Sequence, residues 1–272
     1  MLIAQISDSH FRSRDARLFG ALNTCRALER AVEAVMSLDP RPDAVIHTGD
    51  LVNDGEDGDH RDLSEILGRL SMPIFAVPGN HDRREPLRKA LAWTGSIAAE
   101  GPLSVAANLG SIRLVGLDSL VEGKAGGRLG EEQLGWLDGV LSANPQTPTL
   151  VFVHHPPFAI GIDFMDRIML EDHAGFEAVI GRHPQVELVA CGHAHRIVHT
   201  RFAGTIAMIA PGIAHQVAFD LRPGAPSRWV PEPPSFVLHR WTPQGGFVSH
   251  VVYIEDYGAD APLSDYVARI GQ

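Results

Sequence analysis

Five short polar clusters, each following an apolar stretch, hold the residues of this chain that could bind metal ions or transfer protons. They are Asp8-Ser9-His10, Gly49-Asp50, Gly79-Asn80-His81-Asp82, His154-His155 and Gly192-His193-Ala194-His195. Carboxylate, imidazole and amide groups together suit first-row divalent metal ions. The clusters contain no thiol, which argues against a structural zinc site. They predict a metal site with mixed nitrogen and oxygen ligands.

The candidate ligands outnumber the ligands that one ion needs. They are Asp8, His10, Asp50, Asn80, His154, His193 and His195. The set could hold two ions if one carboxylate bridges them. Two ions about 3.5–4 Å apart can clamp a phosphoryl group for in-line displacement. The residue types therefore favour phosphoryl chemistry at a dinuclear centre.

The apolar periodicity predicts the elements that must position these clusters. Strands are expected over 2–6, 44–47, 74–77, 103–108, 112–117, 149–153, 186–191, 197–202 and 205–209, and helices over 22–36, 62–70, 85–93, 131–141 and 174–180. Each polar cluster follows one of these strands. Loops beyond the carboxyl ends of strands converge on one rim in open α/β architectures, so we expect the clusters to meet in space.

The order of the elements predicts the fold class. Strands and helices alternate early, whereas strands follow one another later and close with a hairpin over 236–241 and 247–254. This order indicates an α/β protein, a four-layer α/β/β/α sandwich of two mixed sheets. One domain is expected over 1–272, with a proline-rich surface excursion near 219–235. Residues 162–166 are expected to form a surface loop, or else one wall of a substrate pocket.

Composition excludes several classes of protein. The chain has 272 residues, of which 44% are hydrophobic, and no apolar run reaches the length of roughly 18 residues that a membrane helix needs. The N-terminus carries no secretory signal, and the only cysteines are Cys25 and Cys191, so we expect a cytoplasmic protein with no membrane partner. A net charge of −10 without a basic stripe argues against binding of long nucleic acids.

The five clusters, in this order over residues 1–200, resemble the sequence blocks of the calcineurin-like metallophosphoesterases. Within that family, further residues resemble the bacterial class III cyclic nucleotide phosphodiesterases and glycerophosphodiesterases. These residues are Asn53, the run His154-His155-Pro156-Pro157, and Pro211-Gly212 followed by His215. The chain has Ser9 where many relatives have threonine, a change at a position that does not ligate metal.

The resemblance implies two groups of three ligands that one carboxylate joins. The first metal would be held by Asp8, His10 and His195, and the second by Asn80, His154 and His193, with Asp50 as the bridge. Water bound to such a metal has a pKa near neutrality, so hydroxide can form without a protein base.

The resemblance also implies roles for the neighbours of the ligands. His81 would stabilise the developing charge or protonate the departing alkoxide, and Asp82 would fix the tautomer of His81. Asn80 and His215 would contact the substrate phosphate together with His81. Asn53 would orient Asn80 or another ligand.

The other histidines have no such assignment. His155 follows a ligand along an extended chain and points the other way, which favours a structural role. No role is assigned to His47, His60, His183, His199, His239 and His250.

We therefore expect a metal-dependent phosphodiesterase that hydrolyses small diesters such as 3′,5′-cyclic AMP or glycerophosphodiesters through attack of metal-bound hydroxide. The alternatives are a phosphomonoesterase with the same metal site and, disfavoured by the complete ligand set, a non-catalytic scaffold of this fold. The acidic net charge argues against a nuclease of the same superfamily. The two ions are expected to be Fe²⁺ or Mn²⁺, with Zn²⁺ or Co²⁺ as alternatives. A homo-oligomer is a further expectation, with Trp229 of the excursion as a candidate contact.

Overall fold

The computed structural model describes residues 1–13, 16–54, 57–255 and 258. Its elements are, in chain order, β1 (Leu2–Ile6), α1 (Thr24–Ser37), β2 (Ala44–His47), α2 (Asp57–Leu67), β3 (Ile74–Ala76), α3 (Arg84–Ala90), the 3₁₀ turn η1 (Ala92–Thr94), β4 (Val105–Leu109), β5 (Ile112–Leu117), α4 (Gly130–Ser142), β6 (Thr149–Val153), α5 (Asp163–Asp166), α6 (His173–Ile180), β7 (Val186–Cys191), β8 (Val198–Phe202), β9 (Thr205–Ile209), β10 (Gln216–Val217), β11 (Trp229–Val230), β12 (Ser235–Thr242) and β13 (Gly246–Tyr253).

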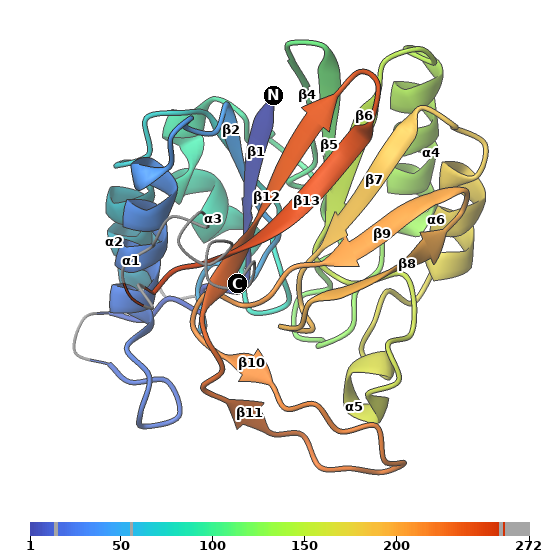
Figure 1. Cartoon of the computed structure of the whole chain (residues 1–272). Helices are drawn as coiled ribbons and strands as arrows, with labels where there is room; N and C mark the ends of the chain where they lie inside the picture. Colours follow the sequence, from blue (N-terminus) through green and yellow to red (C-terminus); the bar gives the residue numbers. More distant parts are fainter. Residues whose placement is uncertain (14–15, 55–56, 256–257, 259–272) are drawn as a thin grey trace, which may run out of the picture.

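Two mixed sheets form the centre of the molecule (Figure 1). The first has the strand order β13-β12-β1-β2-β3, in which β1, β2 and β3 are parallel, β12 is antiparallel to β1, and β13 is antiparallel to β12. The second has the order β4-β5-β6-β7-β9-β8, in which β5, β6, β7 and β9 are parallel. The parallel strands of both sheets run downward in Figure 1, so their carboxyl ends lie at one end of the molecule.

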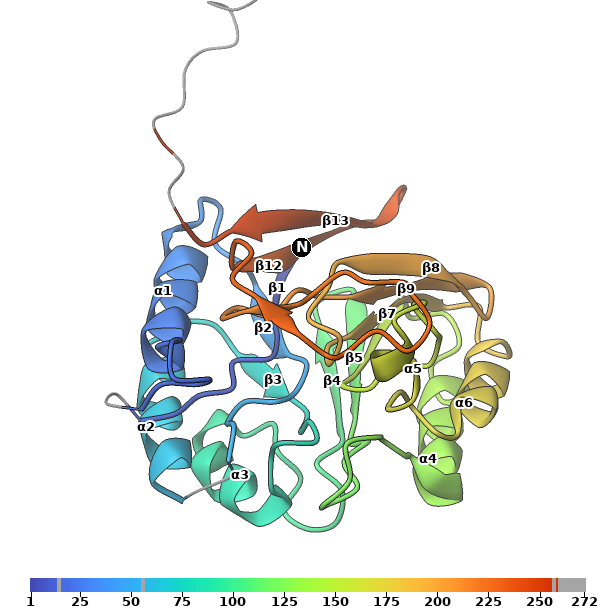
Figure 2. The ribbon, with the colours of Figure 1, turned by 90° about the horizontal axis from the view of Figure 1, so that it is seen from below.

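The sheets pack face to face, with α1, α2 and α3 outside the first and α4 and α6 outside the second (Figure 2). Three apolar cores match the three interfaces between these layers. One core lies between the first sheet and its helices, one lies between the second sheet and its helices, and the third joins the two sheets. The predicted α/β/β/α sandwich of two mixed sheets is therefore confirmed.

Helix α1 illustrates how the sequence specifies a layer. The Asn23 side chain caps its first turn by accepting a hydrogen bond from the backbone N–H of Arg26. Leu28, Ala31 and Val35 recur at helical spacing and are buried against the first sheet. Within the described part of the chain, no helix combines the length and the apolar character needed to cross a bilayer.

Three segments differ from the sequence-based expectations or refine them. Helix α2 runs over Asp57–Leu67 rather than 62–70, and the backbone then leaves the helix at Gly68. Residues 163–166 form the short helix α5 rather than a loop, because the Asp166 carboxylate accepts hydrogen bonds from the N–H groups of Ile160 and Gly161. In the proline-rich excursion, residues 221–224 are exposed, and the two-residue strand β11 pairs with β10.

Phe152 of β6 tests the contribution of the core between the sheets. Its ring is fully buried against the first sheet, and Gly116 of β5 leaves the space that the ring occupies. Phe152→Ala is expected to lower the free energy of unfolding by about 3–5 kcal/mol, because it leaves a cavity between two packed layers. Urea unfolding of the metal-free chain measures this. The control Val248→Ala, at an exposed position, should change the free energy of unfolding by less than about 0.5 kcal/mol. Equal losses of unfolding free energy in the two variants would contradict the placement of Phe152 in the core between the sheets.

Candidate metal centre

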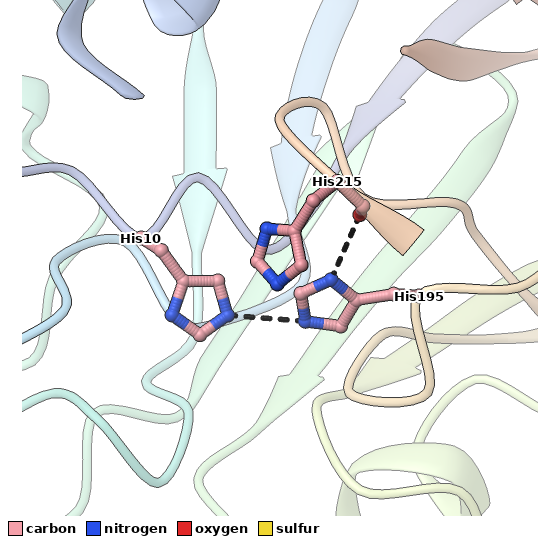
Figure 3. Close-up of side chains that lie close together, drawn as sticks. All are labelled: His10, His195 and His215. Carbon is pink, nitrogen blue, oxygen red and sulfur yellow. Dashed lines mark hydrogen bonds between the residues drawn. The ribbon is translucent and has the colours of Figure 1, made fainter. Parts of the chain in front are cut away.

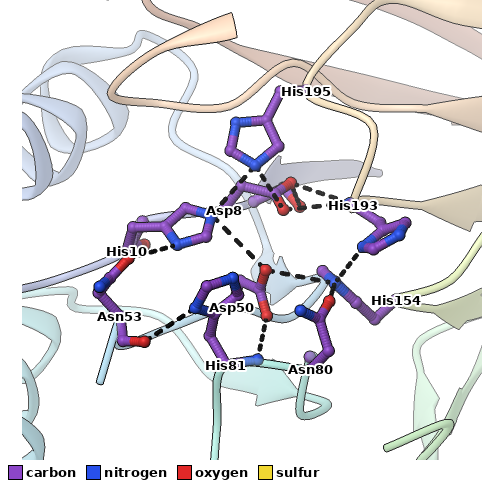
Figure 4. A network of polar contacts seen from close by, with 12 residues as sticks. Asp8, His10, Asp50, Asn53, Asn80, His81, His154, His193 and His195 are labelled. Carbon is purple, nitrogen blue, oxygen red and sulfur yellow. Dashed lines mark hydrogen bonds and ion pairs between the residues drawn. The ribbon is translucent and has the colours of Figure 1, made fainter. Parts of the chain in front are cut away.

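All seven candidate ligands lie together where the parallel strands of both sheets end (Figure 4). Each lies one to four residues beyond the last residue of a strand: Asp8 and His10 after β1, Asp50 after β2, Asn80 after β3, His154 after β6, and His193 and His195 after β7. The sequence-based expectation that the clusters meet in space agrees with this arrangement.

The ligand atoms form two groups. In the first group, His195 Nε2 lies 3.0 Å from His10 Nε2 and 3.3 Å from Asp8 Oδ1. In the second, His154 Nε2 lies 3.2 Å from both Asn80 Oδ1 and His193 Nδ1. These are the two sets of three that the family resemblance implies.

Asp50 connects the groups. Its Oδ2 lies 3.5 Å from His10 Nε2 and 3.5 Å from His154 Nε2. Its Oδ1 accepts a hydrogen bond of 2.9 Å from the backbone N–H of His81, which fixes the carboxylate plane. Oδ2 is thus equally close to both groups, as a bridging ligand must be.

The spacing of the donor atoms fits metal ions. Ligands held about 2.1 Å from one ion at angles between octahedral and tetrahedral are separated by about 3.0–3.4 Å, which matches the distances within both groups. Two imidazole nitrogens that approach to 3.0 Å repel unless a proton or a cation lies between them. The donor set therefore suits two divalent cations bridged by Asp50.

The outer nitrogens of three candidate ligand histidines, His10, His154 and His195, have hydrogen-bond partners. His154 Nδ1 donates to the Thr48 carbonyl at 2.7 Å, and His195 Nδ1 donates to the His215 carbonyl at 3.0 Å. His10 Nδ1 donates to Asn53 Oδ1 at 3.2 Å, so Asn53 contacts a ligand other than Asn80. A proton on Nδ1 leaves the lone pair of Nε2 for a metal.

Burial and mutual charge shift the ionisation of the ligands. Burial opposes ionisation of both Asp8 and Asp50. The charge of His195 nevertheless holds the pKa of Asp8 below its ordinary value, and the charge of His154 holds the pKa of Asp50 below its ordinary value. Burial lowers the pKa of His10 and of His193 to about 3, so both rings are neutral. Burial also disfavours a charge on His154, but Asp50 raises its pKa to about 9. A metal ion would displace this proton.

The backbone at the ligands is strained. Positive φ angles, rare for residues other than glycine, occur at five of the seven: Asp8 (54°), His10 (41°), Asp50 (52°), His193 (69°) and His195 (46°). Each such conformation costs about 1–3 kcal/mol, and residues of this kind gather at functional sites. Neighbouring glycines clear space for the ligands: a Cβ at Gly49 would lie 2.4 Å from His154 Nδ1, and one at Gly79 would lie 2.1 Å from Asp50 Oδ1.

The expected role of Asp82 is wrong. Its buried carboxylate accepts hydrogen bonds from the backbone N–H groups of Leu51, Val52 and Gly79, and does not hold the His81 ring. His81 Nδ1 instead donates to the Asn53 carbonyl at 2.8 Å. Burial and the charge of Asp50 raise the pKa of Asp82 to about 7. Asp82 thus holds the backbone of the loop that follows Asp50. Its position next to His81 in the sequence does not place its carboxylate against the His81 ring.

His155 lies beside the second group, and one of its ring nitrogens lies within 4.8 Å of ring nitrogens of His154 and His193, but both of its ring nitrogens have hydrogen-bond partners outside that group. Nε2 donates to the Ala125 carbonyl at 3.1 Å, and Nδ1 accepts a hydrogen bond of 2.7 Å from the Ser119 hydroxyl. Both nitrogens are therefore engaged by protein groups. A Cβ at Gly127 would lie 2.2 Å from the His155 ring, so this histidine is packed as well as bonded.

His215 lies over the first group (Figure 3). Its ring centroid is 4.5 Å from that of His195 and 5.4 Å from that of His10, and its buried Nδ1 has no hydrogen-bond partner among the described residues. Phe19 meets this ring edge-on at 5.3 Å and stacks on Trp229. Sequence reasoning missed Phe19, because a lone aromatic residue in a loop gives no signal. Trp229 was noted only as a candidate oligomer contact.

Comparison with known proteins shows the family. The sequence model of the calcineurin-like phosphoesterases matches residues 1–196. The chain belongs to the calcineurin-like phosphoesterase family, and membership implies a dinuclear divalent metal site.

Similar proteins extend the match over the rest of the chain. A protein of Arcobacter nitrofigilis named "Probable glycerophosphodiester phosphodiesterase GpdQ" is 35% identical over 264 residues, covering 97% of each chain. The 3′,5′-cyclic adenosine monophosphate phosphodiesterase CpdA of Pseudomonas aeruginosa is 32% identical over 85% of each chain. Among solved structures, a dimetal phosphatase from Danio rerio has a TM-score of 0.64 at 16% identity, covering 94% of this chain and 99% of that one, which shows the shared fold.

Gly49 tests whether close packing positions the second group. Gly49→Ala is expected to displace the His154 ring and weaken metal binding at the second site by at least about tenfold, since its Cβ would overlap Nδ1. Metal content after dialysis against limiting Mn²⁺ measures this. Gly20→Ala is the matched control: Gly20 also has a positive φ, of 70°, but nothing lies within 4 Å of its Cβ position. Equal metal loss in both variants would attribute the effect to backbone strain alone.

Proposed function

We propose that this protein hydrolyses small phosphodiesters, such as 3′,5′-cyclic AMP or glycerophosphodiesters, at a dinuclear metal centre. The observation that carries the proposal is the position of Asp50 Oδ2, which lies 3.5 Å from a histidine of each ligand group. Relatives named as glycerophosphodiester and cyclic nucleotide phosphodiesterases support the diester class.

Each of the two ligand groups would hold one metal ion. Asp8, His10 and His195 would hold the first ion, and Asn80, His154 and His193 the second. When bound, the two ions supply the nucleophile and neutralise the charge on the phosphate oxygens. Asn80 has a partly exposed neutral amide, which makes it the ligand best suited to exchange its contact for one with substrate.

His81 is the proposed acid. Its Nδ1 is held by the Asn53 carbonyl, so Nε2 is the nitrogen that can deliver a proton. The side chain is exposed, and its ring meets His10 edge-on with centroids 4.7 Å apart, which brings it to the rim of the first group. Protonation of the departing alkoxide at this position would assist a poor leaving group.

His215 is a proposed phosphate contact. One nitrogen of its ring lies within 4.8 Å of ring nitrogens of His10 and His195, so the ring lies close enough to the first ligand group to bind an oxygen of a phosphate held there. Burial and the neighbouring His195 lower the pKa of His215 to about 2, so the contact would be made by a neutral ring.

The metal, the location and the assembly state stay predictions. Carboxylate, amide and imidazole ligands suit iron and manganese, with zinc and cobalt as alternatives. Cys191 is a free, buried thiol, which is compatible with the cytoplasm. The exposed excursion around Trp229 is a candidate contact for a homo-oligomer.

Turnover of diesters and monoesters tests the proposed function. Protein loaded with Mn²⁺ or Fe²⁺ is expected to hydrolyse bis(p-nitrophenyl) phosphate, cyclic AMP or glycerophosphoethanolamine faster than p-nitrophenyl phosphate, as expected from the relatives named as diesterases. Comparison of kcat/KM for the four compounds measures this. A faster monoester would identify a phosphatase, and no diester turnover with any of the metals would refute the proposal.

Replacement of His81 tests its role as an acid. His81→Ala is expected to lower kcat about 100-fold or more on diesters with alkoxide leaving groups, but much less on nitrophenyl esters, whose leaving group needs no proton. Metal content should stay at two ions per chain. The control His250→Ala removes an exposed histidine on β13 and should change neither rate. Equal losses on both substrate types would assign His81 to charge stabilisation instead.

A further inference from the structure

A continuous series of hydrogen bonds connects Asp8 to β13, the strand at one edge of the first sheet. The Ser7 hydroxyl lies 2.6 Å from Asp8 Oδ2, and the Thr48 hydroxyl lies 2.7 Å from Ser7 Oγ. Gln5 Nε2 lies 3.0 Å from Thr48 Oγ1, and Gln5 Oε1 lies 3.0 Å from His239 Nε2.

This series of hydrogen bonds ends at the protein surface. His239 Nδ1 lies 2.7 Å from the hydroxyl of Ser249, an exposed residue on β13. Ser7, Thr48, Gln5 and His239 are all completely buried, so water does not compete for their hydrogen bonds. The chain therefore joins β13, β12, β1 and the loop after β2 through the polar interior of the protein.

The amide of Gln5 fixes the direction of every hydrogen bond in the chain. Its NH₂ group must donate to the Cys191 carbonyl at 2.9 Å, because a carbonyl can only accept. Its other N–H then points to the Thr48 hydroxyl, which uses its own hydrogen toward Ser7. On the other side, Gln5 Oε1 accepts from His239 Nε2, which leaves His239 Nδ1 to accept from Ser249. Each donor therefore points toward Asp8.

The end of the chain distinguishes the two oxygens of Asp8. The backbone N–H of His193 lies 3.1 Å from Oδ1 and 3.2 Å from Oδ2, but only Oδ2 accepts the Ser7 hydroxyl, and it is Oδ1 that lies 3.3 Å from His195 Nε2 in the first ligand group. A Cβ at Gly192 would lie 2.3 Å from Ser7 Oγ, so the absence of a side chain at position 192 leaves room for this bond. A hydrogen bond to one oxygen of a ligating carboxylate orients the other toward the metal.

We propose that Gln5, Thr48 and Ser7 are positioning residues for the first metal, which hold Asp8 with Oδ1 toward the ion. The inference rests on the metal centre of the proposed function and adds to it a set of buried residues that touch neither metal nor substrate. His239 completes the set by occupying the oxygen of Gln5. Because hydrogen bonds in such a chain polarise one another, loss of one link weakens the bond at Asp8.

Calorimetric titration of the metal-free full chain with Mn²⁺ tests the inference. Thr48→Val removes the hydroxyl at nearly unchanged shape, and is expected to weaken one of the two sites about tenfold or more. Binding at the other site should stay the same, because the Thr48 carbonyl that holds His154 is retained. Thr48→Ser restores the hydroxyl and should restore the affinity.

Two further variants separate positioning from general destabilisation. Thr149→Val removes another buried threonine hydroxyl, one that bonds only to the Thr147 carbonyl, and should leave both Mn²⁺ affinities unchanged. Ser7→Ala removes the last link and should weaken the same site as Thr48→Val, which keeps the test available if the valine variant does not fold. Wild-type affinity in Thr48→Val or Ser7→Ala, or equal weakening in Thr149→Val, would overturn the inference. An unaltered chain that binds no Mn²⁺ would refute the metal centre itself.

Discussion

The Asp50 carboxylate lies between two groups of buried ligand atoms, and much of the structure serves this arrangement. One oxygen is 3.5 Å from a histidine of each group, while the other is held by the backbone of His81. Imidazole nitrogens this close to one another repel in a site removed from water unless cations lie between them. The positive φ angles at five of the candidate ligands are a strain of the kind that gathers at functional sites.

The fold supplies the rigidity that such a site requires. Three apolar cores fix two sheets and their helices, so the carboxyl ends of β1, β2, β3, β6 and β7 open onto a single rim. Hydrogen bonds between the sheets add to this rigidity. His154 of the second sheet donates to the Thr48 carbonyl of the first, and Gln5 of the first donates to the Cys191 carbonyl of the second. The site thus belongs to both sheets, and because each ligand group takes residues from both, relative movement of the sheets would separate the ligands within each group.

Sequence reasoning succeeded where residue type and position in an element were sufficient. Most strands follow from apolar runs, although β10 and β11 were not predicted, and the candidate ligands follow from polar clusters at strand ends, as at Asp8 and His193. It failed at Asp82, because adjacency in sequence says nothing about which backbone amides a carboxylate reaches. It also missed the contacts of Phe19 with Trp229 and of Gln5 with His239, which join residues more than 200 positions apart. No local pattern encodes such pairs.

We propose that the Asp50 carboxylate bridges two metal ions. Electron paramagnetic resonance of the protein saturated with Mn²⁺ tests this bridge, because ions about 3.5–4 Å apart that share a bridging ligand are magnetically coupled. We expect two Mn²⁺ per protein molecule with the spectrum of a coupled pair, and loss of the coupling in Asp50→Asn. A saturated protein that showed only the spectrum of isolated Mn²⁺ would rule out the bridge.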